Sequence, residues 1–265
     1  MTALSDAEFA QFRRFIHAEA GISLADSKKA LVSGRLAKRL TAHCMSSYTE
    51  YLRLLGSAQA SQERQTAVDL LTTNETYFFR EPRHFAFLAE HLRALGTRDA
   101  PFRVWSAAGS TGEEAYSIAM VLEDCMPGCW QVLASDISSR VLEYARSGHY
   151  ATARLDNVPP AYLQRYCLQG RDGQAGTLLI QRRLRQAVRF EQINLNAPLP
   201  RLGPFDIVFL RNVLIYFNPE TKRDVVARVI ETLAPGGYLF IGHSDSLAEV
   251  DRRLEPVAPA IYRKL

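Results

Sequence analysis

Apolar residues in the first 75 or so positions recur at the three- and four-residue spacing of amphipathic helices. The segment "SDAEFAQFRRFI" opens with a capping box, in which Ser5 and Glu8 are placed to satisfy the first free backbone N–H groups. Further helices are expected from Asp26 to about 40, from Ser47 onward, over about 61–72, and after Pro82 in "RHFAFLAEHLRAL". The beginning of the chain is therefore predicted to be all-helical.

From Phe102 onward the pattern changes to short β-rich runs that alternate with helical segments. The runs are "FRVWSA", "WQVLAS", "VRFEQINL", "FDIVFL" and "GGYLFIG", with helices at 113–126, in "SRVLEYARSG" and from Pro219 to Leu233. Such alternation predicts an α/β fold, with a mainly parallel sheet that binds its ligands at the carboxyl ends of the strands. Over about 155–187 the alternation breaks around "QGRDGQAG", so we expect a small β insertion there.

The composition agrees with this division and adds little to it. The chain has 265 residues, of which 47% are hydrophobic and 23% charged, which is typical of globular proteins. We divide it into a helical domain over 1–75 and a sheet domain over 76–265. No apolar run approaches the roughly 18 residues that span a bilayer, and "MTALSDAEFAQF" is too polar for a signal peptide, so a cytoplasmic protein without membrane insertion is expected.

Charge and cysteine content restrict the function only weakly. The net charge of +4 does not by itself indicate nucleic-acid binding. Of the four cysteines, only Cys125 and Cys129 are close in sequence, and neither a second cysteine pair nor a histidine cluster follows at zinc spacing. Neither a metal site nor a disulfide framework is therefore predicted.

The most informative local feature is the stretch "RVWSAAGSTGEEAYSIAM", which predicts a strand, a glycine-bearing loop and a helix. A phosphate-binding loop would carry three glycines, whereas this loop has two and places Glu113 and Glu114 in the first helical turn. These carboxylates repel phosphate and attract a cation, such as the ammonium or sulfonium of S-adenosylmethionine. Alternatively, both are ordinary acidic residues at a helix N-terminus.

A second acid follows the next strand. Asp136 ends "VLASD", where a carboxylate can accept hydrogen bonds from both hydroxyls of an adenosine ribose. Enzymes that bind nicotinamide dinucleotides share this feature, so Asp136 indicates a ribose rather than one cofactor. It can also be a helix N-cap, a role that Ser138 can equally fill.

Two further segments, "TTNETYFFRE" and "FDIVFLRNVLIYFNPETKRDVV", carry a resemblance to a known family. Together with the glycine loop, "ASDISSRVLEYARSGHY" and "APGGYLFIGHSDSL", they closely resemble CheR-type chemotaxis receptor methyltransferases in the same order along nearly the whole chain. Members of this family use S-adenosylmethionine to methylate glutamate side chains of bacterial chemoreceptors. One departure is Ala115, where the family usually has proline; both residues suit a first helical turn.

The resemblance implies a Rossmann-like S-adenosylmethionine domain and a set of site residues. Arg80 and Tyr216 are implied to position the substrate. The implied cofactor contacts are Asn74, Thr76, Arg80, one or both of Glu113 and Glu114, Asp136, Asn194, Leu195, Asn212 and Val213. Without the resemblance, Tyr216 and Phe217 would be assigned to an aromatic core and Arg80 to a surface ion pair with Glu75 or Glu81; the motif match reverses this preference.

Two regions outside the site are candidates for partner binding. The second helix is basic, and Lys28, Arg35, Lys38 and Arg39 are expected to dock along an acidic chemoreceptor bundle, unless they form only a solvated face. The family's β insertion sometimes binds a short peptide from a receptor C-terminus, and here "QGRDGQAGTLLIQ" is the candidate edge for strand addition.

Three other functions remain open at this level: a methyltransferase acting on another protein or a small molecule, an adapter that keeps the fold without catalysis, and a nucleic-acid-binding protein. The third lacks a nucleic-acid motif and exposed aromatic residues among the basic ones.

Overall fold

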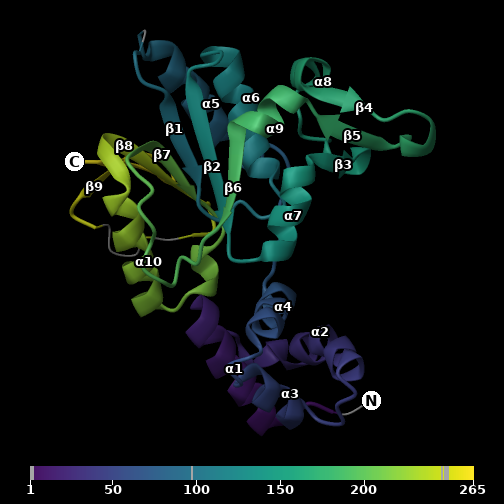
Figure 1. Cartoon of the computed structure of the whole chain (residues 1–265). Coiled ribbons are helices and arrows are strands. Elements are labelled where there is room, and N and C mark those ends of the chain that lie inside the picture. The colour runs from purple at the N-terminus through teal and green to yellow at the C-terminus, as the bar shows by residue number, and fades with distance from the viewer. Residues whose placement is uncertain (1–2, 97, 246, 248–250) are drawn as a thin grey trace.

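The computed structural model describes residues 3–96, 98–245, 247 and 251–265. The first four α-helices form one layer-like group below the sheet domain, and the β insert projects from the side of that domain (Figure 1). Within the part of the chain that the structure describes, none of the helices is both long and apolar enough to cross a membrane.

The N-terminal helices bury one apolar face each around a shared core. Phe12, Ile16 and Tyr51 are fully buried in it. The capping box is confirmed, because Ser5 Oγ accepts from the Glu8 N–H while the Glu8 carboxylate accepts from the Ser5 N–H. The elements are α1 (Asp6–Ala20), the 3₁₀ turn η1 (Asp26–Lys28), α2 (Lys29–Ala42), α3 (Tyr48–Leu55) and α4 (Ser61–Leu71).

The sheet domain has the predicted α/β architecture. Its seven strands lie in the order β6-β2-β1-β7-β8-β10-β9, and the first five of these are parallel to one another. Their bounds are β1 (Phe102–Ser106), β2 (Trp130–Asp136), β6 (Val188–Gln192), β7 (Phe205–Leu210), β8 (Leu233–Ile241), β9 (Leu254–Ala258) and β10 (Ile261–Lys264). The antiparallel strands β10 and β9 were not predicted; they are short and lack a run of apolar residues.

Helices cover both faces of this sheet, as Figure 1 shows. Helices α5 (Pro82–Ala94) and α6 (Glu113–Cys125) pack with one face of the sheet, and α10 (Pro219–Glu231) packs with the other. The chain places β2 and β6 on one side of β1, and β7 and β8 on the other. The strand order therefore reverses beside β1, and a crevice for a ligand is expected at the carboxyl ends of β1 and β7.

The insertion is a separate three-stranded antiparallel sheet in the order β3-β5-β4. It begins after α7 (Ser139–Ser147), earlier than the predicted residue 155, because Tyr150 in the first strand pairs with Leu178. Its elements are β3 (His149–Ala151), η2 (Thr152–Arg154), α8 (Pro160–Tyr166), β4 (Cys167–Gln169), η3 (Asp172–Gln174), β5 (Thr177–Ile180) and α9 (Arg182–Ala187). The segment "QGRDGQAGTLLIQ", expected to include a docking edge, runs from the end of β4 into β5; β5 is the central strand, so the free edges of this sheet are β3 and β4.

Candidate active site

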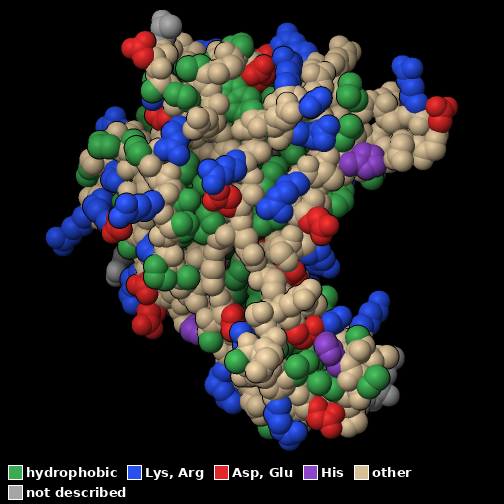
Figure 2. Space-filling model, viewed as in Figure 1, with side chains coloured by type: hydrophobic (Ala, Val, Ile, Leu, Met, Phe, Trp, Pro, Cys, Tyr) green, Lys and Arg blue, Asp and Glu red, His purple; other side chains and the backbone are tan. Residues whose placement is uncertain are grey.

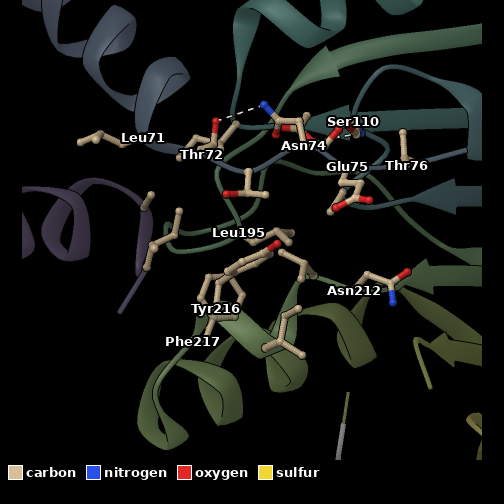
Figure 3. Close-up of a pocket in the computed structure, with 18 of the residues that line it drawn as sticks. Leu71, Thr72, Asn74, Glu75, Thr76, Ser110, Leu195, Asn212, Tyr216 and Phe217 are labelled. Atoms are coloured by element: carbon tan, nitrogen blue, oxygen red, sulfur yellow. Dashed lines mark hydrogen bonds between the residues drawn. The ribbon is translucent and has the colours of Figure 1, made fainter. Parts of the chain in front are cut away.

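A cavity of about 530 Å³ lies at the carboxyl ends of the parallel strands, where the N-terminal helices meet the sheet domain. Ile22 forms an isolated bridge with Phe217, and the Ser23 N–H donates to the Tyr216 carbonyl, which joins the two domains at its edge. Figure 3 shows Asn74 and Ser110 on one side of this pocket and Tyr216 and Phe217 on the other. Of the residues implied by the resemblance, these line it: Asn74, Thr76, Arg80, Glu114, Asp136, Asn194, Leu195, Asn212, Val213 and Tyr216.

The two adjacent glutamates of the loop have opposite surroundings. Glu114 lines the pocket, where its carboxylate accepts from Ser106 Oγ at 2.7 Å and pairs with Arg211 at 3.1 Å. Glu113 is fully buried on the far side of the loop and pairs with Arg154 of the insert. Glu113 is therefore turned away from the pocket, because successive helical residues point about 100° apart, and Glu114 alone of the pair faces a ligand.

Asp136 lies at the end of β2 and is almost fully buried. Its two oxygens accept backbone N–H groups, from Ser110 at 3.0 Å and from Ser138 at 2.9 Å. Burial raises the pKa of the Asp136 carboxyl to about 6, against the opposing effect of these hydrogen bonds. Ser138 is the N-cap of α7, but its side chain forms no cap hydrogen bond. Asp136 stabilises the turn instead, by accepting from the Ser138 N–H. Each carboxylate oxygen has a second lone pair that can accept from a ligand.

A buried arginine that the motif reading did not select joins two carboxylates beneath the pocket. Arg211 follows β7 directly, its side chain is 1% exposed, and it pairs with Glu114 at 3.1 Å and Glu81 at 3.2 Å. Burial raises the pKa of Glu114, and the Arg211 charge opposes this effect. A charged residue immediately after the apolar run "FDIVFL" is the sequence signal that would have identified it.

Glu81 organises the same corner through its second oxygen. It accepts from Asn212 Nδ2 at 3.3 Å and from the His243 N–H at 3.2 Å. His84 is buried beside it, with Nδ1 3.4 Å from Glu81, and burial lowers the pKa of His84 to about 4. Although Glu81, His84 and His243 cluster closely enough to suggest a cation site, Arg211 already neutralises the carboxylate.

Asp245 is a second buried carboxylate outside the predicted set. It accepts the backbone N–H groups of Asn212 at 2.6 Å and Ile215 at 3.1 Å. Asn212 has a positive φ of 56°, and a Cβ at Gly242 would lie 2.4 Å from its Nδ2. Asp245 therefore braces a left-handed residue after β7, as Asp136 braces Ser110, whose φ is 49°, after β1.

We call Glu114, Asp136 and Arg211, which line the pocket, together with Glu81 and Asp245, which lie behind them and bond to Arg211 and Asn212, the pocket floor. All five side chains are buried or nearly so. The four carboxylates accept hydrogen bonds from neighbouring groups, and Arg211 pairs with two of them. Lys28, Arg80 and Tyr216 form the pocket mouth, which is more open to solvent.

At the pocket mouth, Arg80 donates to the Glu75 carbonyl at 3.1 Å and lies over the Tyr77 ring at 5.7 Å. Its guanidinium makes no ion pair with any carboxylate in the described residues; Glu81 is taken by Arg211 instead. Burial raises the pKa of Tyr216, and the positive charge of Arg80 opposes this effect. Tyr216 is half-buried against the pocket rather than a core residue.

The four basic residues expected to dock a partner fall into two pairs. Lys28 and Lys38 are exposed, and Lys28 also lines the pocket. Arg35 instead donates to the Leu71 and Thr72 carbonyls at 3.2 and 2.8 Å, which caps the end of α4.

Arg39 likewise serves the domain itself. It forms two hydrogen bonds with Glu63, which also accepts from Tyr51 at 2.6 Å. Although burial opposes ionisation, these bonds hold the pKa of Glu63 at about 2. The expectation that Arg35 and Arg39 offer free basic groups to a partner is therefore wrong, because both head groups form hydrogen bonds within the N-terminal domain. Figure 2 shows basic and acidic side chains interspersed on the face of the molecule in view, with an indentation between the insert and the N-terminal helices.

The donor set of the pocket fits S-adenosylmethionine better than a phosphate ligand. Burial raises the pKa values of two pocket-lining carboxylates, Glu114 and Asp136. A ligand that brings positive charge and hydroxyl donors would offset the desolvation cost of their ionised forms. Leu195, Val213 and Phe217 supply apolar surface for a base. A phosphate would meet these carboxylates at the helix N-terminus where it normally binds.

Comparison with known proteins agrees with this fit. Residues 74–262 match the family profile "CheR methyltransferase, SAM binding domain", and residues 7–72 match "CheR methyltransferase, all-alpha domain". The chain is 44% identical over 264 residues to the chemotaxis protein methyltransferase of Escherichia coli (strain K12), covering 98% of this chain and 91% of that protein.

Two further relatives carry similar names. The Salmonella typhimurium chemotaxis protein methyltransferase is 43% identical, covering 98% of this chain and 91% of the relative. Chemotaxis protein methyltransferase 2 of Pseudomonas aeruginosa is 40% identical, covering 96% and 92%. The resemblance inferred from the motifs is thereby confirmed: the chain belongs to the CheR family of methyltransferases and uses S-adenosylmethionine as its cofactor.

Proposed function

We propose that the protein transfers the methyl group of S-adenosylmethionine to glutamate side-chain carboxylates of chemoreceptors, giving methyl esters in chemotactic adaptation. The observation that carries this proposal is the division of charge within one pocket. Acidic residues at the pocket floor suit a cationic cofactor, and the arginine at the pocket mouth, without a carboxylate partner among the described residues, suits an anionic substrate.

The chemistry needs no general base. A glutamate with a pKa of about 4.3 is already ionised at neutral pH, so its oxygen is a nucleophile as it arrives. When bound, the cofactor would supply a methyl group activated by the positive charge on sulfur, and its S–CH3 bond would break to leave neutral S-adenosylhomocysteine. The remaining task of the protein is to bring the carboxylate into line and to exclude water.

Arg80 and Tyr216 are the side chains we assign to that task. The Arg80 guanidinium can hold one substrate oxygen by a charge-assisted hydrogen bond, and the Tyr216 hydroxyl can donate to the same group. Both side chains line the pocket. A contact that binds too tightly would stabilise the ground state, and a single, partly solvated arginine limits that effect.

The N-terminal domain is proposed to guide the substrate to the pocket mouth. Its segment 20–25 forms part of the pocket wall, and Lys28 is exposed at the same edge. An acidic helical surface would meet Lys28 and Lys38 first, which increases the encounter rate at low salt. Because the glutamates that this family methylates belong to receptor cytoplasmic domains, we also place the protein in the cytoplasm.

A receptor C-terminal peptide is proposed to bind the insert by strand addition. The free edge that suits it is β4, where Leu168 is 52% exposed, rather than the central strand β5.

The proposal is tested with methyl-labelled S-adenosylmethionine and purified receptor cytoplasmic fragments. We expect label on the receptor that is released as methanol by mild base, and loss of label when the exposed receptor glutamates are changed to glutamine. Base-stable label would indicate a different acceptor atom. Cofactor binding without any transfer would indicate an adapter.

A further inference from the structure

We propose that Tyr150 and Arg154, from the first strand of the insert and the turn after it, are positioning residues that hold the cofactor loop in its binding geometry. Neither side chain lines the pocket. The inference rests on the proposed placement of the cofactor against residues 107–114, and it assigns the insert a role in cofactor binding that is separate from any peptide docking.

The loop between β1 and α6 has one residue facing the pocket and the next facing the insert. Ser110 lines the pocket, donates its N–H to Asp136 and donates its hydroxyl to the Asn74 carbonyl at 3.1 Å. On the other side, the carbonyl of Thr111 accepts from the Tyr150 hydroxyl at 2.7 Å. A displacement of Thr111 therefore moves Ser110 and its contacts with Asp136 and Asn74.

Arg154, whose side chain is 42% exposed, contacts the same loop through the fully buried carboxylate of Glu113. It pairs with Glu113, whose carboxylate also accepts from Thr111 Oγ1 at 2.6 Å, and it donates to Thr111 Oγ1 at 3.3 Å. Among the ion pairs of the described residues, Arg154 is the partner of Glu113, so removal of Arg154 leaves a buried carboxylate without a cation.

Tyr150 also touches the second segment of the site. Its ring is 1% exposed and packs edge-to-face on Phe78 at 5.0 Å, and Phe78 belongs to the segment that carries Asn74 and Arg80. Gly112 allows the close approach of Tyr150 to the loop. Its φ is 94°, and a Cβ there would lie 2.9 Å from the Tyr150 hydroxyl. The insert thus braces both segments that face the cofactor from outside the pocket.

A second arginine of the insert also pairs with a residue of α6 and serves as a matched control. Arg165 of α8 pairs with Asp124 near the C-terminal end of α6, far along the helix from Glu113 at its start. Both pairs join the insert to α6, and only the Arg154 pair adjoins the cofactor loop.

We would measure the dissociation constant of S-adenosylmethionine by calorimetry for Arg154→Ala, Tyr150→Phe and Arg165→Ala. The expected increases are about tenfold, about threefold and less than twofold. At saturating cofactor, Arg154→Ala should retain its kcat and its receptor KM, and Arg154→Lys should recover part of the lost affinity. If Arg154→Ala does not fold, Tyr150→Phe, which keeps the buried ring, decides the question.

Unchanged affinity in both Arg154→Ala and Tyr150→Phe would overturn the inference, as would an equal loss in Arg165→Ala, which would show a general loss of insert packing. Asp136→Asn serves as the separate check on cofactor placement. If that variant binds the cofactor normally, the proposed site itself is wrong; if it binds weakly while Arg154→Ala and Tyr150→Phe bind normally, only the positioning role fails.

Discussion

The pocket floor and the pocket mouth differ in whether their arginine is paired with carboxylates. At the floor, Arg211 is 1% exposed and has two carboxylate partners, and Asp136 accepts two backbone N–H groups. At the mouth, Arg80 is only partly buried and its described hydrogen bond is to a backbone carbonyl. The floor is therefore preorganised for one ligand, whereas the mouth keeps donors available for another.

This difference predicts which step of the reaction a substitution in each region should affect. Changes at the floor should act on folding and cofactor affinity, because buried charges lose their partners. Changes at the mouth should act on the transfer step, because the substrate carboxylate loses its orientation.

The largest effect is expected for Arg211→Met at the floor. The substitution leaves Glu81 and Glu114 buried without their cation, and breaking such pairs typically costs about 3–5 kcal/mol. Urea denaturation should show a loss of this size, and cofactor binding should be undetectable. The control Arg253→Ala removes a surface pair with Asp251 and should cost less than about 1 kcal/mol. Equal stability of the two variants would contradict the buried role.

Arg80→Ala at the mouth should lower kcat by about 100-fold, because one charge-assisted contact to the nucleophile is lost. Cofactor affinity should change by less than about fivefold, since the floor remains intact. Steady-state kinetics with receptor fragments and calorimetry with the cofactor separate the two effects. Normal methyl transfer by the purified variant would remove Arg80 from the mechanism.

The pH dependence of cofactor binding should reveal Asp136. Its pKa of about 6 in the folded protein lies above the value of about 3.9 expected when unfolded. Its contribution to the stability of the ligand-free protein is thus fully present below pH 4 and is lost as the pH rises through 6.

The ionised form is the better acceptor for two ribose hydroxyls, so cofactor affinity should increase about tenfold from pH 5 to pH 7. Calorimetry across this range should give a midpoint near 6, and Asp136→Asn should remove the dependence. A flat profile in the unsubstituted protein would count against a ribose contact at Asp136.

The smallest effect is expected for Tyr216→Phe. The ring stays in place and only one neutral hydrogen bond to the substrate is lost, which corresponds to a decrease in kcat of about three- to tenfold. The receptor KM should change little. A decrease as large as that of Arg80→Ala would mean that the hydroxyl, rather than the guanidinium, carries the alignment.

Much of the fold was predictable because its signals are local. The capping box at Ser5, the alternation from β1 to β8 and the break at the insert all come from short-range patterns. The edge strands β9 and β10 were missed because their pairing is tertiary and their residues lack a β-rich run.

The site was predictable to the level of segments rather than of side-chain directions. Motif positions selected Glu114, Asp136 and Asn212, which line the pocket. The sequence could not show that Glu113 faces the insert, or that Arg35 and Arg39 are engaged inside the N-terminal domain. Such pairings join residues far apart in the chain, so charge counting along a helix cannot reveal them.

The most direct test of the division between floor and mouth is a cofactor titration of methyl transfer by Asp136→Asn and Arg80→Ala. With saturating S-adenosylmethionine, Asp136→Asn should approach the kcat of the unsubstituted protein, because its defect is in binding. Arg80→Ala should remain about 100-fold slower at every cofactor concentration. Rescue of Arg80→Ala by excess cofactor, or a persistent defect in Asp136→Asn, would contradict the account.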